Sequence, residues 1–215
     1  MTEVQVRQQY DSLASVYDQQ WNWYVTNTLS FLKTWVNLSV SETLLDIACG
    51  IGEFERMVLR ENPNQQIVGV DISEEIEMLA IARQKLHNYA NVAFQVGSAS
   101  ALSVSDQSFD VIISANAFHY FDDPAAALAE MKRVLKPNGK VVTLDWCKDF
   151  WLCRICDALL QRTDPAHQQC YTQREFYDFL TSSGFNIDAS GKVCFGIVWG
   201  LMVATAVPQT IEPAE

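Results

Sequence analysis

Residues 43–52 read Thr-Leu-Leu-Asp-Ile-Ala-Cys-Gly-Ile-Gly, a short apolar run that ends in a Gly-x-Gly turn. A helical stretch follows this turn and continues until Pro63 stops it. The glycines allow the backbone to bend tightly and to approach a ligand with no Cβ in between. The order strand, glycine turn, helix is typical of the first unit of a parallel sheet that binds its ligand at the strand exit.

The same strand and helix rhythm repeats toward the C-terminus. Apolar runs at 67–70, 92–96, 109–114 and 141–144 predict four further strands, and Asp123-Pro124 predicts the start of the helix over 125–135. Strands of near-continuous Val, Ile and Leu that alternate with amphipathic helices predict a doubly wound α/β fold, with helices on both faces of a mostly parallel sheet.

The ends of the chain depart from this rhythm. Residues 1–40 show two helical patterns, and residues 146–171 interrupt the alternation after the fifth strand, as an insertion does. Thr172 and Glu175 predict a capping box for a helix that ends at Gly184, and two apolar strands follow it. The sequence therefore predicts seven strands in all.

Composition restricts the partners. The chain has 215 residues, with 15 Lys and Arg against 26 Asp and Glu and a formal charge of -11, so its surface potential opposes nucleic acid. The longest apolar run, 195–207, is shorter than the roughly 20 residues of a membrane-spanning helix. No signal-peptide pattern opens the chain, and six cysteines in a chain of this size suit free thiols. We expect a cytoplasmic protein without a membrane span.

Acidic residues near the glycine turn point to a ligand. Asp71 ends the second strand about 20 residues after Gly52, the spacing of a carboxylate that accepts ribose hydroxyls. A dinucleotide fingerprint needs a small residue three positions after Gly52, where Glu55 stands, so an NAD-dependent dehydrogenase is disfavoured. Asp46 lies inside a buried strand, where an unpaired carboxylate is costly, so it predicts a functional role.

Four stretches together resemble class I S-adenosylmethionine-dependent methyltransferases, of the methyltransferase type 11-like kind that acts in ubiquinone and menaquinone biosynthesis: 44–52, 68–73, 109–119 and 133–140. The resemblance implies a Rossmann-like seven-stranded sheet with an antiparallel edge. It also implies a single domain over 1–215, with a helical lid over 1–40, a cofactor-binding core over 41–145, an insertion or cap over 146–171, and a closing helix with edge strands over 172–207.

The resemblance also implies how the cofactor, S-adenosylmethionine, is held. Gly50 and Gly52 lie against its methionine portion, Asp46 beneath its amino group, and Asp71 at the ribose. Ser98 stands where the family usually has an acid that binds the adenine amino group. The full set of expected cofactor-binding residues is Tyr17, Asp46, Ala48, Cys49, Gly50, Gly52, Asp71, Ile72, Ser98, Ala99 and Asn116.

Methyl transfer is an in-line displacement, so the protein mainly holds the two reactants and excludes water. His119 and Asp145, each just beyond a strand, are candidate catalytic groups, with a histidine that merely orders its loop as the alternative. Trp21, Trp146 and Trp151 lie in the two covering segments and are expected to form an aromatic lid over the substrate, unless they only pack the lid onto the sheet.

A group of thiols in the insertion raises the question of a metal. Cys153 and Cys156 lie one helical turn apart, with Cys147, His167 and Cys170 nearby in sequence. This set lacks the regular paired spacing of zinc ligands, so we predict no metal and interpret the thiols as small apolar residues.

The sequence thus predicts a methyltransferase that uses S-adenosylmethionine to methylate a small-molecule acceptor. The acceptor atom, whether O, N, C or S, and the oligomeric state stay open. The alternative is a non-catalytic S-adenosylmethionine-binding module that acts in regulation or through protein contacts, because the glycines and Asp71 fit both functions.

Overall fold

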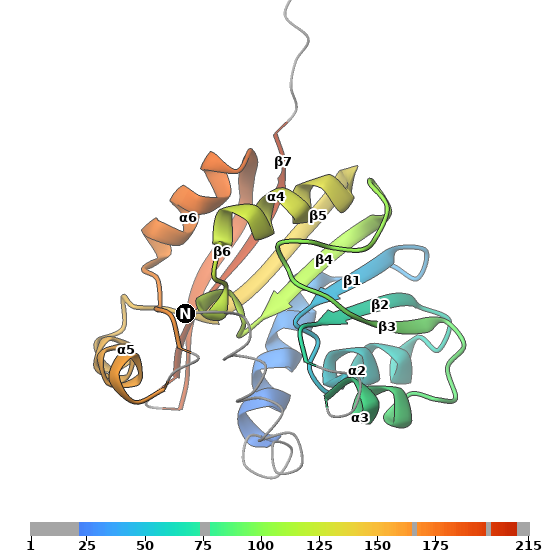
Figure 1. Cartoon of the computed structure of the whole chain (residues 1–215), viewed down its shortest axis with the longest axis horizontal. Coiled ribbons are helices and arrows are strands. Elements are labelled where there is room, and N and C mark those ends of the chain that lie inside the picture. The colour runs from blue at the N-terminus through green and yellow to red at the C-terminus, as the bar shows by residue number, and fades with distance from the viewer. Residues whose placement is uncertain (1–21, 74–77, 165–166, 197–198, 210–215) are drawn as a thin grey trace, which may run out of the picture.

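The computed structural model describes residues 22–73, 78–164, 167–196 and 199–209 (Figure 1). Its centre is one seven-stranded sheet in the order β3-β2-β1-β4-β5-β7-β6. The strands are β1 (Thr43–Ile47), β2 (Gln66–Asp71), β3 (Val92–Val96), β4 (Phe109–Ala115), β5 (Leu135–Trp146), β6 (Phe185–Phe195) and β7 (Trp199–Pro208). β1 to β5 pair in parallel, whereas β7 pairs antiparallel with both β5 and β6. The predicted fold class is confirmed, including the antiparallel edge.

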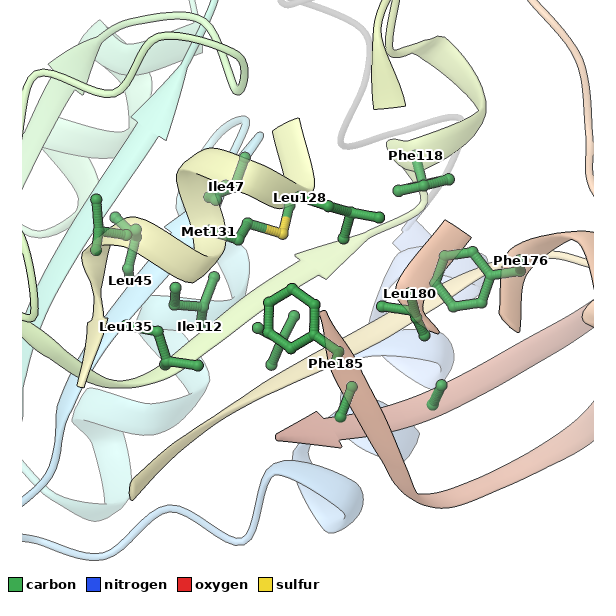
Figure 2. Packing of buried hydrophobic residues seen from close by; sticks show 14 of the residues in the cluster. Leu45, Ile47, Ile112, Phe118, Leu128, Met131, Leu135, Phe176, Leu180 and Phe185 are labelled. Atoms are coloured by element: carbon green, nitrogen blue, oxygen red, sulfur yellow. The ribbon is translucent and has the colours of Figure 1, made fainter. Parts of the chain in front are cut away.

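Helices cover both faces of this sheet (Figure 1). The helix over residues 22–36, α2 (Glu53–Glu61) and α3 (Met78–Lys85) contribute to one core cluster, and α4 (Pro124–Val134) and α6 (Gln173–Ser182) contribute to the other. Successive strand residues point to opposite faces, so Leu44 joins the first cluster while Leu45 and Ile47 join the second. Figure 2 shows the second cluster, where Leu128 and Met131 of α4 lie over the sheet.

Local chemistry sets the helix starts that the sequence predicts. The Asp123 carboxylate accepts a hydrogen bond from the backbone N–H of Ala126, with Pro124 in the first helical turn of α4. Thr172 and Glu175 form the predicted capping box of α6. After α6 the chain turns at Gly184, which has a φ of 81°, a conformation that favours glycine.

β5 begins earlier than the sequence suggests. A turn over 136–139 is expected from Lys-Pro-Asn-Gly, but β5 already starts at Leu135, where α4 ends. Leu135 pairs with Phe109, and the register then shifts before Val111. A Cβ at Gly139 would lie 2.7 Å from the carbonyl oxygen of Asp110, so glycine permits close packing of these two strands.

The insertion after β5 leaves the fold and rejoins it at neighbouring points. Cys147 and Tyr171, near its two ends, are joined by a β-bridge, and the backbone N–H of Lys148 donates to the carbonyl of Tyr171 at 2.8 Å. Between them lies α5 (Trp151–Thr163), which Figure 1 shows set to one side of the sheet. The bridge fixes where the insertion leaves and rejoins the fold.

We find no helix in the described ranges that combines the length and apolar character required to cross a bilayer.

Candidate functional site

A pocket opens where the strand order reverses, between β1 and β4, which is the place where open α/β sheets bind ligands. Its volume is about 1140 Å³ when the space at its open mouth is included. The walls come from the exits of β1, β2, β3 and β4, from the helix over 22–36, from the starts of α2 and α3, and from the short 3-10 turn over 118–120. The lining residues are Val25, Leu29, Asp46, Ile47, Ala48, Cys49, Gly50, Ile51, Glu53, Phe54, Asp71, Ile72, Met78, Gly97, Ala99, Ala115, Asn116, Ala117, Tyr120 and Phe121.

The turn after β1 and the end of β2 are tied together at the pocket. The Asp71 carboxylate accepts hydrogen bonds from the backbone N–H groups of Gly50 (2.8 Å) and Ser73 (2.9 Å). Each carboxylate oxygen has two acceptor positions, so both retain one for a ligand hydroxyl. Burial raises the pKa of Asp71, while these backbone hydrogen bonds oppose the rise. Asp71 can therefore hold the turn and accept a diol at the same time.

Two wall residues have left-handed backbone conformations without being glycine. Ala48 has a φ of 63° and Asn116 a φ of 54°. Such conformations cost of order 1–3 kcal/mol for residues with a Cβ and cluster at ligand sites. Gly50, with a φ of 54°, adopts the same region without that cost.

Buried carboxyl groups concentrate behind the turn. Burial, reinforced by the nearby Glu55 and Asp71, raises the pKa of Asp46 well above its usual value. Burial also raises the pKa of Glu55 to about 8, and neither oxygen of its carboxyl group has a hydrogen-bond partner among the described residues. Glu53 is different, because Arg56 pairs with it and Lys85 lies 4.0 Å away. A cationic ligand fits this acid-rich end of the pocket, because its charge would offset the repulsion among the carboxylates.

Most of the expected cofactor-binding residues lie at the pocket. Those that line it are Asp46, Ala48, Cys49, Gly50, Asp71, Ile72, Ala99 and Asn116. Ser98 lies between two lining residues, Gly97 and Ala99, and its hydroxyl accepts a hydrogen bond from the Ser100 N–H. Tyr17 and Trp21 lie outside the described residues.

Gly52 is surrounded by protein side chains. It is not part of the pocket wall, and a Cβ built on it would lie 3.0 Å from the Ala82 Cβ and 3.3 Å from the Phe94 ring. The missing side chain of Gly52 lets the turn approach α3 and β3, a packing role that the sequence did not predict and that stands beside the expected contact with the cofactor.

The structure brings His119 and Asp145 together. The His119 Nδ1 lies 2.6 Å from one oxygen of Asp145, and the His119 backbone N–H donates to the other oxygen at 3.2 Å. Both side chains are buried, and neither lines the pocket, although the adjacent Tyr120 does. An acid that accepts the Nδ1 proton leaves Nε2 as the basic nitrogen, which is the arrangement of an oriented imidazole base.

An aromatic cluster adjoins this pair. Tyr24 donates its hydroxyl proton to the Asn116 side chain at 2.6 Å and accepts from the Trp146 indole N–H at 2.8 Å. The Trp199 ring lies 4.9 Å from Tyr24 and 5.1 Å from Trp146, and Trp146 stacks on His119 with 5.3 Å between ring centroids. We call Tyr24, Trp146 and Trp199 the aromatic cluster.

Only one member of this cluster, Trp146, was predicted from the sequence. Tyr24 and Trp199 were missed because they lie far apart in the chain, and only the antiparallel pairing of β7 with β5 brings Trp199 to Trp146. Trp151, expected at the substrate, is 68% exposed on α5 and is absent from the pocket wall. Trp146, which the structure places at the end of β5, therefore lies in this region, whereas Trp151 of the insertion does not.

Comparison with known proteins places the fold and the pocket in context. The profile of a protein family described as "Methyltransferase domain" matches residues 38–184. The chain belongs to this methyltransferase family. The match covers all the strands from β1 to β5 that surround the pocket, so the motif-based assignment to the S-adenosylmethionine-dependent methyltransferases is confirmed.

One relative in sequence is named as a methyltransferase, and two solved structures share the fold. A demethylmenaquinone methyltransferase of Bacteroides fragilis is 30% identical over 66% of this chain, and the match spans 60% of the relative's length. A putative methyltransferase from Haloferax volcanii, solved with the Trm112 methyltransferase activator, has a TM-score of 0.84 at 19% identity and covers 97% of this chain and 100% of its own. An S-adenosylmethionine-dependent methyltransferase from Methanosarcina mazei has a TM-score of 0.68 at 22% identity and covers 81% of this chain and 95% of its own.

Proposed function

We propose that this methyltransferase transfers the methyl group of S-adenosylmethionine to a planar, largely apolar small molecule. The observation that carries the proposal is the pocket itself, in which the Gly50 turn, the Asp71 carboxylate and the buried Asp46 converge at the reversal of strand order. A cofactor with a ribose and two positive charges matches these groups in both shape and sign.

The residues of the pocket divide the work of binding. Asp71 accepts the ribose hydroxyls, Asp46 attracts the methionine ammonium, and the segment around Ser98 and Ala99 contacts the adenine. When bound, S-adenosylmethionine supplies a methyl group activated by its sulfonium. The remaining task of the protein is to orient the acceptor and to exclude water.

The part of the pocket wall near helix 22–36 supports the proposed acceptor class. Val25, Leu29 and Phe121 are apolar, and Tyr120 and Asn116 add a few polar atoms, a combination typical of sites for apolar ligands. The similarity to demethylmenaquinone methyltransferases suggests an aromatic ring such as a quinol. Helix 22–36 and the aromatic cluster, which includes the expected Trp146, then act as the lid. Trp21 lies outside the described residues, and Trp151 does not line the pocket.

His119 and Asp145 are the proposed proton-accepting pair. A quinol or another hydroxylic acceptor loses a proton when it is methylated, and His119 lies beside Tyr120 with a ring-centroid distance of 4.1 Å. Asp145 fixes the imidazole and stabilises its charged form after proton uptake. A non-catalytic binding module needs neither a lid over an acceptor nor a proton-accepting pair, so these two features favour an enzyme.

Calorimetric titration tests the cofactor first. We expect S-adenosylmethionine to bind with one site per chain and NAD to give no heat, since Glu55 occupies the position of the third fingerprint residue. Incubation with methyl-labelled cofactor and a panel of hydroquinones and naphthoquinols then tests turnover. Binding without transfer to any acceptor, including those in metabolite extracts, would favour the non-catalytic binding module. NAD binding in preference to S-adenosylmethionine would overturn the proposal.

A further inference from the structure

Helix α5 is attached to the protein by unusual side chains. Its buried residues are Cys153 and Asp157, one turn apart at positions i and i+4, which place them on the same helix face. By contrast, its large apolar residues Trp151, Ile155 and Leu159 are 57% to 68% exposed. A helix normally buries its apolar stripe. Interactions other than hydrophobic packing must therefore attach the face of α5 that carries Cys153 and Asp157 to the rest of the protein.

The loop that follows α5 brings two more donor atoms to that face. Asp157, His167 and Cys170 are all buried, and one ligand atom from each lies within 4.8 Å of the others. The fourth group, Cys153, lies one turn before Asp157 on the same buried face of α5, and its thiol raises the pKa of Cys170. His167 is fully buried, and its Nδ1 has no hydrogen-bond partner in the part of the chain that the structure describes. One carboxylate, one imidazole and two thiols therefore meet in the interior of the insertion.

We propose that Cys153, Asp157, His167 and Cys170 form a structural Zn²⁺ site that fastens α5 to the body of the insertion. Zinc takes sulfur, nitrogen and carboxylate oxygen in a closed tetrahedron, with bonds of about 2.0–2.3 Å. The four residues form two pairs, one on a helix face and one within a loop. The sequence led us to predict no metal because Cys147, Cys153, Cys156, His167 and Cys170 lack the regular paired spacing of zinc ligands, and Asp157 was not among the residues considered.

A small movement makes room for the metal between two of the ligands. The His167 Nε2 and one oxygen of Asp157 are 2.8 Å apart, and tetrahedral zinc bonds would separate them to about 3.3 Å. The metal then replaces the proton that these two atoms share. The backbone N–H of Cys170 also donates to the same Asp157 oxygen at 2.7 Å, which already holds the carboxylate and the loop together.

The surrounding charge suits a zinc ion with these ligands. Two thiolates and one carboxylate carry three negative charges, so the site with Zn²⁺ keeps one. The Lys148 ammonium, 2.8 Å from the second Asp157 oxygen, offsets that remaining charge and orients the ligand from outside. The same lysine also pairs with Asp157 when no metal is bound, so metal content must be measured directly.

The experiment uses the full chain, purified without a histidine tag from zinc-supplemented medium under reducing conditions. We expect about one zinc per chain after gel filtration, and after exchange with Co²⁺ the visible absorption of tetrahedral thiolate coordination. Cys153→Ser and Cys170→Ser each change one ligand atom and should lower the zinc content at least tenfold. Cys156→Ser on the same helix and Cys194→Ser at the exposed position are matched controls that should keep it.

Folding is monitored so that loss of metal is not confused with loss of structure. Zinc removal by a chelator should lower the Tm of the wild type, while Cys170→Ser should start at the lower Tm and not respond. The proposal is overturned if the folded wild type carries no zinc and takes up no Co²⁺, or if the Cys156→Ser control loses the metal as the ligand variants do. Because the readout is metal content, failure here leaves the methyltransferase proposal untouched.

Discussion

The Asp71 carboxylate accepts a hydrogen bond from the backbone N–H of Gly50 at 2.8 Å, so the end of β2 holds the turn that follows β1. A side chain expected to contact only the ligand is thus also part of the scaffold that shapes the pocket. Changes at Asp71 therefore act on cofactor affinity through two routes, the loss of a ligand contact and the release of the turn.

Asp71→Ala is expected to weaken S-adenosylmethionine binding by ~2–4 kcal/mol, because it removes charge-assisted hydrogen bonds in a partly dry site. Calorimetry on the folded variant measures the effect. Asp123→Ala is the matched control, since it removes an N-cap of α4 that does not line the pocket and should cost ~1 kcal/mol of stability without changing the Kd. Equal affinities in the wild type and Asp71→Ala would contradict the ribose assignment.

Glu55 predicts an unusual pH dependence of stability. Its folded pKa is raised from 4.5 to about 8, mainly by burial, so the folded state keeps a proton that the unfolded state loses. The stabilising contribution is present below pH 4.5 and is lost as the pH rises toward 8, at a slope of roughly 1.4 kcal/mol per pH unit. We expect the free energy of unfolding to fall across this window.

Glu55→Gln should remove this slope, because the amide does not titrate, and the variant should exceed the wild type in stability at pH 8 relative to pH 5. Denaturant unfolding of both proteins at several pH values measures the difference. Glu61→Gln, at an exposed position of α2, should follow the wild type at each pH. Parallel curves for the wild type and Glu55→Gln would show that Glu55 finds a partner in solution.

His119→Gln and Asp145→Asn test the proton-accepting pair once an acceptor is known. Loss of a general base is expected to lower kcat by roughly 10²-fold or more, with little change in the Kd of S-adenosylmethionine. Single-turnover methyl transfer and calorimetry separate the two quantities. A loss of affinity with unaltered kcat would instead make His119 a residue that orders the pocket wall.

The sequence predicted the parts of the fold that local patterns determine. Continuous apolar strands, the Asp123 cap and the Thr172 capping box each carry their own signal within a few residues, and the structure has all of them. The start of β5 was missed because Lys-Pro-Asn-Gly favours a turn, whereas pairing of Leu135 with Phe109 keeps the chain extended. Tertiary pairing overrides local propensity there.

Within the candidate site, some residues could be predicted from local sequence patterns and others could not. The glycine turn, Asp46 and Asp71 follow strands directly, so their convergence at one edge of the sheet could be predicted. The aromatic cluster could not, because Tyr24 reaches it from the N-terminal helix and Trp199 reaches it from the last strand. The buried neighbourhood of Gly52 likewise depends on α3, whose distance from the turn is not encoded in the motif.

Trp146 at the end of β5 and Trp151 at the start of α5 provide the last prediction, because their surroundings in the structure are very different. Trp146 donates its indole N–H to Tyr24 and stacks on His119, whereas Trp151 is 68% exposed on α5. Trp146→Leu should therefore lower kcat/KM for the acceptor by ~2–3 kcal/mol in transition-state stabilisation, through lost burial and a released Tyr24. Trp151→Leu should change kcat/KM by less than about twofold, as expected for a surface substitution.

Steady-state kinetics with the identified acceptor measure kcat/KM for both variants, and circular dichroism checks their folding. Equal kcat/KM values for the two variants would mean that the aromatic cluster only packs the protein and does not cover the acceptor.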